Sequence, residues 1–170
     1  TLLMVSKHKR VHILFISILC ISMVFSQNTV RGLLRSSNIA PADIYTNQWA
    51  LIIGINKYQD FPQLNYAVED AKSIQTLLTT QYGFPEENII LLLDDDATKT
   101  AITDAFYTLG EKTREEDAVI VFFAGHGETR NIAGSNEDLG YLIPIDGKQG
   151  NMPRTALSMQ TINIQSDEIS

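Results

Sequence analysis

The chain has 170 residues, 44% of them hydrophobic, with 13 basic and 20 acidic side chains and a net charge of −7. This length and composition predict one globular domain and exclude collagen-like, disordered and disulfide-rich proteins. Three of the basic residues lie in the first 26, so the remainder carries 10 basic against 20 acidic residues. We therefore expect no nucleic-acid partner, because nucleic-acid binding needs clustered lysines and arginines.

Residues 1–26 have the order of a secretory signal peptide. A basic stretch, Lys7–Arg10, precedes the largely apolar run Val11–Phe25. Because this run is short for a membrane span, we expect a cleaved signal peptide, with an uncleaved membrane anchor as the alternative. Either would export the following domain, which would be secreted, periplasmic or membrane-anchored. Residues 27–47 are polar and predict a linker.

The domain predicted over residues 48–170 contains three extended segments that are apolar along almost their whole length. They are Trp49–Ile55, Asn88–Leu93 and Ala118–Phe123. Such runs are typical of strands buried on both faces of a parallel sheet. Gly140–Asp146 is a shorter extended segment, and its Pro144 predicts an edge strand or a turn.

Two helices are expected between the three apolar strands. Residues 67–82 place apolar side chains at helical spacing, and Gly83 supplies a C-terminal cap. Thr98 is expected to cap a second helix, whose Ile102 and Phe106 share one face. This alternation predicts an α/β fold, a βαβαβ unit with a parallel sheet and right-handed crossovers.

The last part of the chain, residues 147–170, is polar and weakly patterned, and only a helix starting near Ser166 is expected there. Three strands and two helices would leave one face and one edge of the sheet uncovered. We therefore expect the domain to be incomplete at its C-terminus.

Polar residues follow each of the three apolar strands. Ligands of parallel sheets bind beyond the carboxyl ends of the strands, where Asp70, Asp94–Asp96 and His126 are expected to gather. Asp70 lies near a helix N-terminus, which would keep it ionised to receive a cation or would simply stabilise the helix. Three adjacent carboxylates cannot all point at one ion, so Asp94–Asp96 are expected to form a solvated loop rather than a metal or phosphate site.

His126 is the candidate with the most specific setting. It is flanked by Gly125 and Gly127 directly after an apolar strand, and the two glycines would allow a sharp turn and close approach of a ligand. Imidazole is suited to proton transfer near neutral pH. The alternative is a structural histidine in a strand-end turn.

Four segments together resemble the caspase-like cysteine peptidases of the metacaspase and paracaspase type. They are Ala50–Tyr58, Leu64–Ala71, Phe122–Gly127 and Gly140–Asp146, in the family's order and spacing. The resemblance covers about residues 48–146. It implies the caspase-like fold, a parallel-sheet sandwich, and hydrolysis of peptide bonds by a Cys/His dyad.

The resemblance also implies residue roles. His126 matches the catalytic histidine that activates a cysteine thiol, and Gly127 matches the glycine whose N–H helps to form the oxyanion hole. Asp70 matches the acidic residue of the specificity pocket in relatives that cleave peptide and protein substrates after Arg or Lys, where a carboxylate pairs with the basic side chain.

The main departure from the family is the nucleophile, which is expected after the next parallel strand in an Asp-x-Cys setting. No such segment precedes Ser170, and Cys20, the only cysteine, lies in the signal-like run. We therefore expect this chain to be an N-terminal part of the peptidase and inactive on its own. No cofactor is expected; calcium binds to metacaspases, and Glu137 and Asp138 are its only weak candidates here.

Two other functions fit parts of the pattern. A non-catalytic caspase-like module for interaction or regulation would retain His126 as a relic, but its exposed sheet edges argue against a stable product. A receiver-like domain that is phosphorylated within Asp94–Asp96 would share the βαβ layout, but it leaves the Gly-His-Gly turn unexplained.

Overall fold

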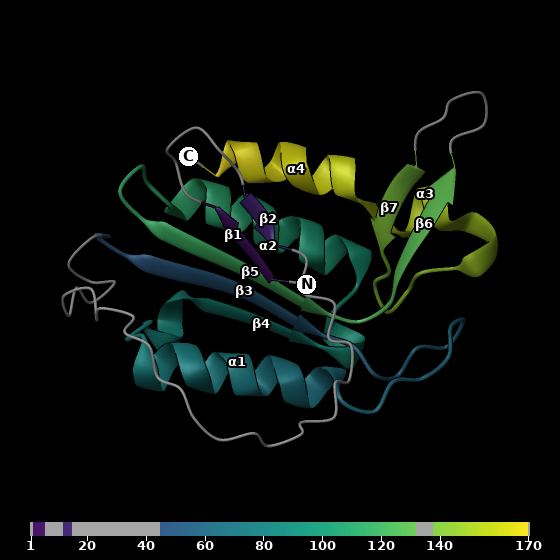
Figure 1. Cartoon of the computed structure of the whole chain (residues 1–170), viewed down its shortest axis with the longest axis horizontal. Coiled ribbons are helices and arrows are strands. Elements are labelled where there is room, and N and C mark those ends of the chain that lie inside the picture. The colour runs from purple at the N-terminus through teal and green to yellow at the C-terminus, as the bar shows by residue number, and fades with distance from the viewer. Residues whose placement is uncertain (1, 6–11, 15–44, 132–137, 170) are drawn as a thin grey trace, which may run out of the picture.

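The structure is a computed structural model and describes residues 2–5, 12–14, 45–131 and 138–169 (Figure 1). Its larger sheet has the strand order β2-β1-β5-β3-β4. The central strand β3 pairs in parallel with β4 and with β5. The predicted parallel α/β unit is therefore confirmed. The strands are β1 (Leu2–Val5), β2 (His12–Leu14), β3 (Gln48–Gly54), β4 (Ile89–Leu93) and β5 (Ala118–Ala124).

Helices cover both faces of this sheet. Helix α1 (Ala67–Gln81) lies on one face, and helices α2 (Lys99–Lys112) and α4 (Met159–Glu168) lie on the other (Figure 1). Gly83, two residues after the end of α1, has a φ of +73°. The Thr98 side chain caps α2 by accepting a hydrogen bond from the Ala101 N–H. Both local signals were predicted from the sequence. Single 3-10 turns, Glu86–Asn88 and Asp94–Asp96, flank β4.

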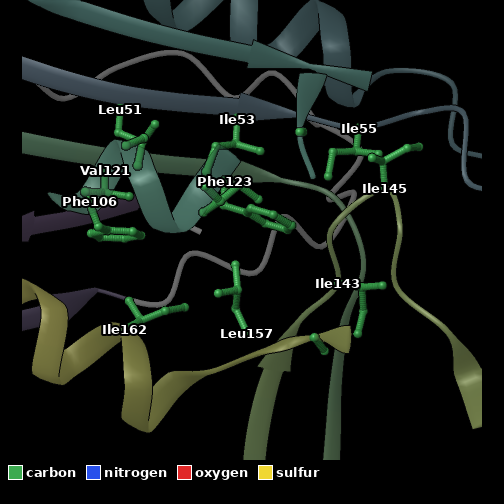
Figure 2. Packing of buried hydrophobic residues seen from close by; sticks show 14 of the residues in the cluster. Leu51, Ile53, Ile55, Phe106, Val121, Phe123, Ile143, Ile145, Leu157 and Ile162 are labelled. Atoms are coloured by element: carbon green, nitrogen blue, oxygen red, sulfur yellow. The ribbon is translucent and has the colours of Figure 1, made fainter. Parts of the chain in front are cut away.

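The core consists of two apolar layers, one on each side of the sheet. Figure 2 shows the larger layer, in which Ile53 and Val121 of the sheet meet Phe106 of α2 and Ile162 of α4. The smaller layer packs Ala50 and other sheet residues against α1. Burial of these side chains is the main stabilising contribution to the fold, because each removes apolar surface from water.

A second, antiparallel sheet follows the carboxyl end of β5. It has the strand order β6-β7-β8, with β6 (Gly127–Asn131), β7 (Asp138–Leu142) and β8 (Leu157–Ser158). The extended segment expected from Gly140 is β7, and after it the Gly147 N–H donates to the Pro144 carbonyl oxygen in a turn. A 3-10 turn (Gln149–Asn151) and the short helix α3 (Met152–Thr155) connect β7 to β8.

The prediction for residues 147–170 was wrong. These residues contain α3, β8 and ten residues of helix α4, which ends rather than begins near Ser166. The side chain of Ser166 is buried, and its hydroxyl donates to the Ile162 carbonyl oxygen. A polar residue on the buried side of α4 weakens the amphipathic pattern by which the helix could have been recognised.

The expectation of an uncovered sheet face was wrong as well, whereas β4 is an edge strand that pairs only with β3 among the described strands. Met159 and Ile162 of α4 pack against the face that α2 leaves open. The edge of β5 that faces away from β3 pairs with β1 in antiparallel register. The side chains of two sequence-distant helices thus complete one layer of the core.

The expected leader and linker fall mostly outside the described residues. Within residues 1–26 the structure describes only the backbone strands β1 and β2, and within residues 27–47 only the last three residues. The signal peptide or anchor therefore stays a prediction. None of the helices in the described ranges is long and apolar enough to span a bilayer.

Candidate active site

His126 is the second residue after β5, at the carboxyl end of the parallel strands, and is half-buried. Its ring packs against two aromatic rings of the loop that follows β3, and these two rings also contact each other, with centroids 6.1 Å apart. The imidazole centroid is 4.7 Å from that of Tyr58 and 5.8 Å from that of Phe61. Because the rings of Tyr58 and Phe61 restrict the orientation of the imidazole, the packing of this loop determines the position of the His126 ring.

The ring of His126 is also oriented by a backbone carbonyl. Its Nε2 atom lies 2.7 Å from the carbonyl oxygen of Pro62. A carbonyl oxygen can only accept a hydrogen bond, so Nε2 carries the proton in this contact. In the neutral ring the lone pair then belongs to Nδ1, which is the atom that can accept a proton from a nucleophile.

Tyr58 connects the aromatic packing to the backbone of His126. Its buried hydroxyl donates to the Ile143 carbonyl oxygen at 2.8 Å and accepts from the His126 N–H at 3.0 Å. Burial raises the pKa of Tyr58 to about 12, the hydrogen bond from His126 acts in the opposite direction, and the charge of Asp94 raises it further. The hydroxyl is therefore neutral near pH 7 and able to serve as donor and acceptor at once.

The two glycines beside His126 have different roles. A Cβ at Gly125 would lie 2.5 Å from the Tyr58 hydroxyl, so this position must be glycine for the tyrosine to approach. At Gly127 the nearest atom to such a Cβ is the Tyr141 carbonyl oxygen, at an ordinary 3.6 Å. The close approach expected at both glycines is therefore present at Gly125, whereas Gly127 begins β6 without a steric need for glycine.

Asp70 lies in the first turn of α1, which follows the carboxyl end of β3. Because β3 and β5 are neighbours in the sheet, Asp70 and His126 follow adjacent strand ends. The Asp70 side chain is exposed. The described residues therefore do not enclose this carboxylate in a pocket.

The acidic cluster Asp94–Asp96 is not a uniformly solvated loop. Asp94 has a φ of +43°, and its Oδ1 accepts from the backbone N–H groups of Asn56 and Lys57 at 2.7 and 3.0 Å. Asp95 and Asp96 are exposed, as expected. The prediction was thus wrong for Asp94, because its partners lie in another loop, 37 and 38 residues away in the sequence.

The described residues do not fit a metal site. Across residues 45–131 and 138–169, no three His, Cys, Asp or Glu side chains gather closely enough to hold an ion. Of the two weak calcium candidates, Glu137 lies outside the described residues, and Asp138 is exposed and accepts a hydrogen bond from the Asn131 amide.

Sequence reasoning did not single out Tyr58, Phe61 and Pro62 as site residues, although all three lie in the loop at the carboxyl end of β3. That loop borders the same sheet edge as His126. Their position after a strand end was the signal that could have identified them.

The sequence was compared with models of known protein families. The family model described as "caspase domain", of the C14 peptidases, matches residues 47–165. The chain belongs to this family. Its members are cysteine peptidases of the caspase and metacaspase type, which confirms the predicted family and its α/β fold.

Curated relatives agree with this assignment. Metacaspase-1A of Aspergillus oryzae is 33% identical over 109 residues, which are 59% of this chain and 26% of the relative. Metacaspase-1 of Eremothecium gossypii is 32% identical over 109 residues, 59% of this chain and 24% of the relative. The chain thus spans about a quarter of the length of these metacaspases.

A solved structure supports the fold alone. The crystal structure of a protein from Geobacter sulfurreducens matches with a TM-score of 0.55 and 18% identity, covering 70% of this chain and 44% of the other.

Proposed function

We propose that this caspase-domain chain supplies the histidine of a Cys/His dyad in a cysteine endopeptidase that cleaves after Arg or Lys. The contact between His126 Nε2 and the Pro62 carbonyl oxygen is the observation that supports it most directly. This contact leaves the lone pair at Nδ1 of His126, the arrangement that a general base needs to take a proton from a thiol.

The remaining parts of the reaction are assigned from the family. The proposed thiolate attacks the peptide carbonyl carbon, and the backbone N–H of Gly127 stabilises the resulting oxyanion. The imidazolium of His126 then protonates the leaving amine, and water hydrolyses the acyl-enzyme. Cys20, the only cysteine of the sequence, lies outside the described residues, and the proposal places the thiol in a part of the protein that this sequence does not include.

Asp70 is the proposed contact for the basic side chain at the cleavage site. It is exposed, on the helix that follows β3, and so accessible to a peptide at this sheet edge. The carboxylate of Asp70 can bind the guanidinium of a substrate arginine through two parallel hydrogen bonds. An acidic side chain of a substrate could not form these bonds with Asp70. Arg is therefore the expected preference, with Lys second.

The full-length gene product tests this function. Its coding sequence is expected to encode a strand followed by Asp-x-Cys, and the protein is expected to hydrolyse Arg-ended fluorogenic peptides but not Asp-ended ones.

Two variants test the roles of single residues. His126→Ala should abolish turnover. Asp70→Asn should lower kcat/KM for Arg-ended peptides at least about tenfold, while Asp104→Asn, which changes an exposed carboxylate on α2, should not. A cysteine-free coding sequence, or cleavage after Asp alone, contradicts the proposal.

A further inference from the structure

Three hydrogen bonds form a closed cycle around the backbone of His126. The Tyr58 hydroxyl donates to the Ile143 carbonyl oxygen, the Ile143 N–H donates to the His126 carbonyl oxygen at 3.0 Å, and the His126 N–H donates back to the Tyr58 hydroxyl. Every member of the cycle is both donor and acceptor. Both polar backbone groups of His126 are therefore held by the same tyrosine and its hydrogen-bonded partner.

Asp94 holds the loop that carries Tyr58. Its carboxylate accepts from the two successive backbone N–H groups of Asn56 and Lys57, and the Lys57 ammonium lies 3.6 Å from its second oxygen. The left-handed backbone of Asp94 is unfavourable for most residues other than glycine, asparagine and aspartate. Such a conformation persists only where surrounding contacts hold it, and here the carboxylate supplies those contacts.

The same loop carries the other groups that contact the imidazole. Phe61 packs on the ring, and the Pro62 carbonyl oxygen accepts from Nε2 of His126. The Leu64 N–H donates to the Asn56 carbonyl oxygen, which closes the loop on the segment that Asp94 binds. Displacement of Asn56 and Lys57 would thus move the three loop residues that contact the imidazole, Tyr58, Phe61 and Pro62.

We propose that Asp94 and Tyr58 are positioning residues that together hold His126 in the tautomer and orientation required for proton transfer. Asp94 acts at a distance, through the backbone of Asn56 and Lys57. Tyr58 acts directly, through its ring and hydroxyl. The inference that this geometry serves catalysis depends on the proposed peptidase function, whereas the positioning itself does not.

The ring of His126 can be observed directly in the 170-residue chain. Two-bond proton–nitrogen correlation spectra at a pH at which imidazole is neutral distinguish the Nε2–H tautomer from the Nδ1–H tautomer. The His126→Gln variant assigns the signal among the chain's three histidines. The wild-type chain is expected to show mainly Nε2–H.

Tyr58→Phe keeps the ring but removes the hydroxyl, and Asp94→Ala removes the acceptor of the loop. Each is expected to lower the ratio of Nε2–H to Nδ1–H tautomer about fivefold or more, the effect of weakening one hydrogen bond. Asp94→Asn retains an acceptor oxygen and should restore most of the wild-type ratio. Asp95→Ala is the matched control, because Asp95 is the exposed neighbour, and it should leave the spectrum unchanged.

Wild-type His126 spectra in folded Tyr58→Phe and Asp94→Ala chains would overturn the proposal. Should Asp94→Ala fail to fold, the nearly isosteric Tyr58→Phe decides. In the full-length protein the same two variants should lower kcat for Arg-ended peptides about 10- to 100-fold with KM little changed. A shifted tautomer ratio without any peptidase activity in the wild-type protein would refute the proposed function and leave the positioning intact.

Discussion

The hydroxyl oxygen of Tyr58 lies 3.0 Å from the backbone nitrogen of His126, 68 residues further along the chain. A phenol from the loop after β3 thus binds the second residue after β5. Because this hydroxyl is buried and neutral, the free energy of unfolding depends on the protonation state of Tyr58.

Stability should fall at high pH because of Tyr58. Its pKa is about 12 in the folded chain against 10.0 ordinarily, so the folded state favours the neutral phenol. The contribution of Tyr58 to the free energy of unfolding is fully present below about pH 10 and is lost as the pH rises towards 12. The total loss is about 2 to 3 kcal/mol. Urea unfolding between about pH 8 and 12 measures it.

Tyr58→Phe should flatten this pH dependence, since phenylalanine has no proton to lose. Tyr107→Phe is the control, because Tyr107 is 60% exposed. An unchanged slope in Tyr58→Phe would show that other groups cause the alkaline loss.

Gly125→Ala should destabilise the chain by about 1 to 3 kcal/mol, the usual cost of overpacking. The added Cβ would lie 2.5 Å from the Tyr58 hydroxyl and 2.9 Å from the Phe123 ring. Gly127→Ala, two residues away with only ordinary contacts, should change the free energy of unfolding by less than about 0.5 kcal/mol. Equal effects of the two substitutions in urea titrations would contradict the steric role of Gly125.

Gly54→Ala should lower the free energy of unfolding by about 3 kcal/mol or more, because the added methyl group would push α1 away from the sheet. A Cβ there would lie 2.6 Å from the Ala71 Cβ and 2.7 Å from the Ala67 carbonyl oxygen, and neither atom belongs to a flexible side chain. Thermal unfolding followed by circular dichroism measures the loss. Gly150→Ala, which meets nothing within 4 Å, is the matched control and should melt near the wild-type temperature.

Asp117→Ala should destabilise the start of β3 by about 2 to 3 kcal/mol, since it removes an acceptor from several donors. The Asp117 carboxylate accepts from both the backbone and side-chain N–H of Asn47, from the Trp49 indole and from the Arg114 N–H. Trp49 is the only tryptophan, so its fluorescence reports the change during unfolding. Asp104→Ala, at an exposed position of α2, should behave like the wild-type chain; a similar loss in both would argue against this network.

The sequence was sufficient for the parts of the fold that local patterns encode. Continuous apolar runs identified β3, β4 and β5, and helical spacing identified α1 and α2, because buried parallel strands and amphipathic helices have distinct periods. Gly83 and Thr98 marked helix ends for equally local reasons. By contrast, β6 is exposed along its whole length and α4 buries a serine, so neither has a clear pattern.

For the site, the sequence alone determined that His126 follows a buried strand between two glycines, at the edge where parallel sheets bind ligands. Only the tertiary structure decided which atoms surround it. The Pro62 carbonyl oxygen, the Tyr58 hydroxyl and the carboxylate of Asp94 act across 37 to 68 residues of sequence. Such contacts leave no periodic trace in the chain, because they depend on how three loops meet at one sheet edge.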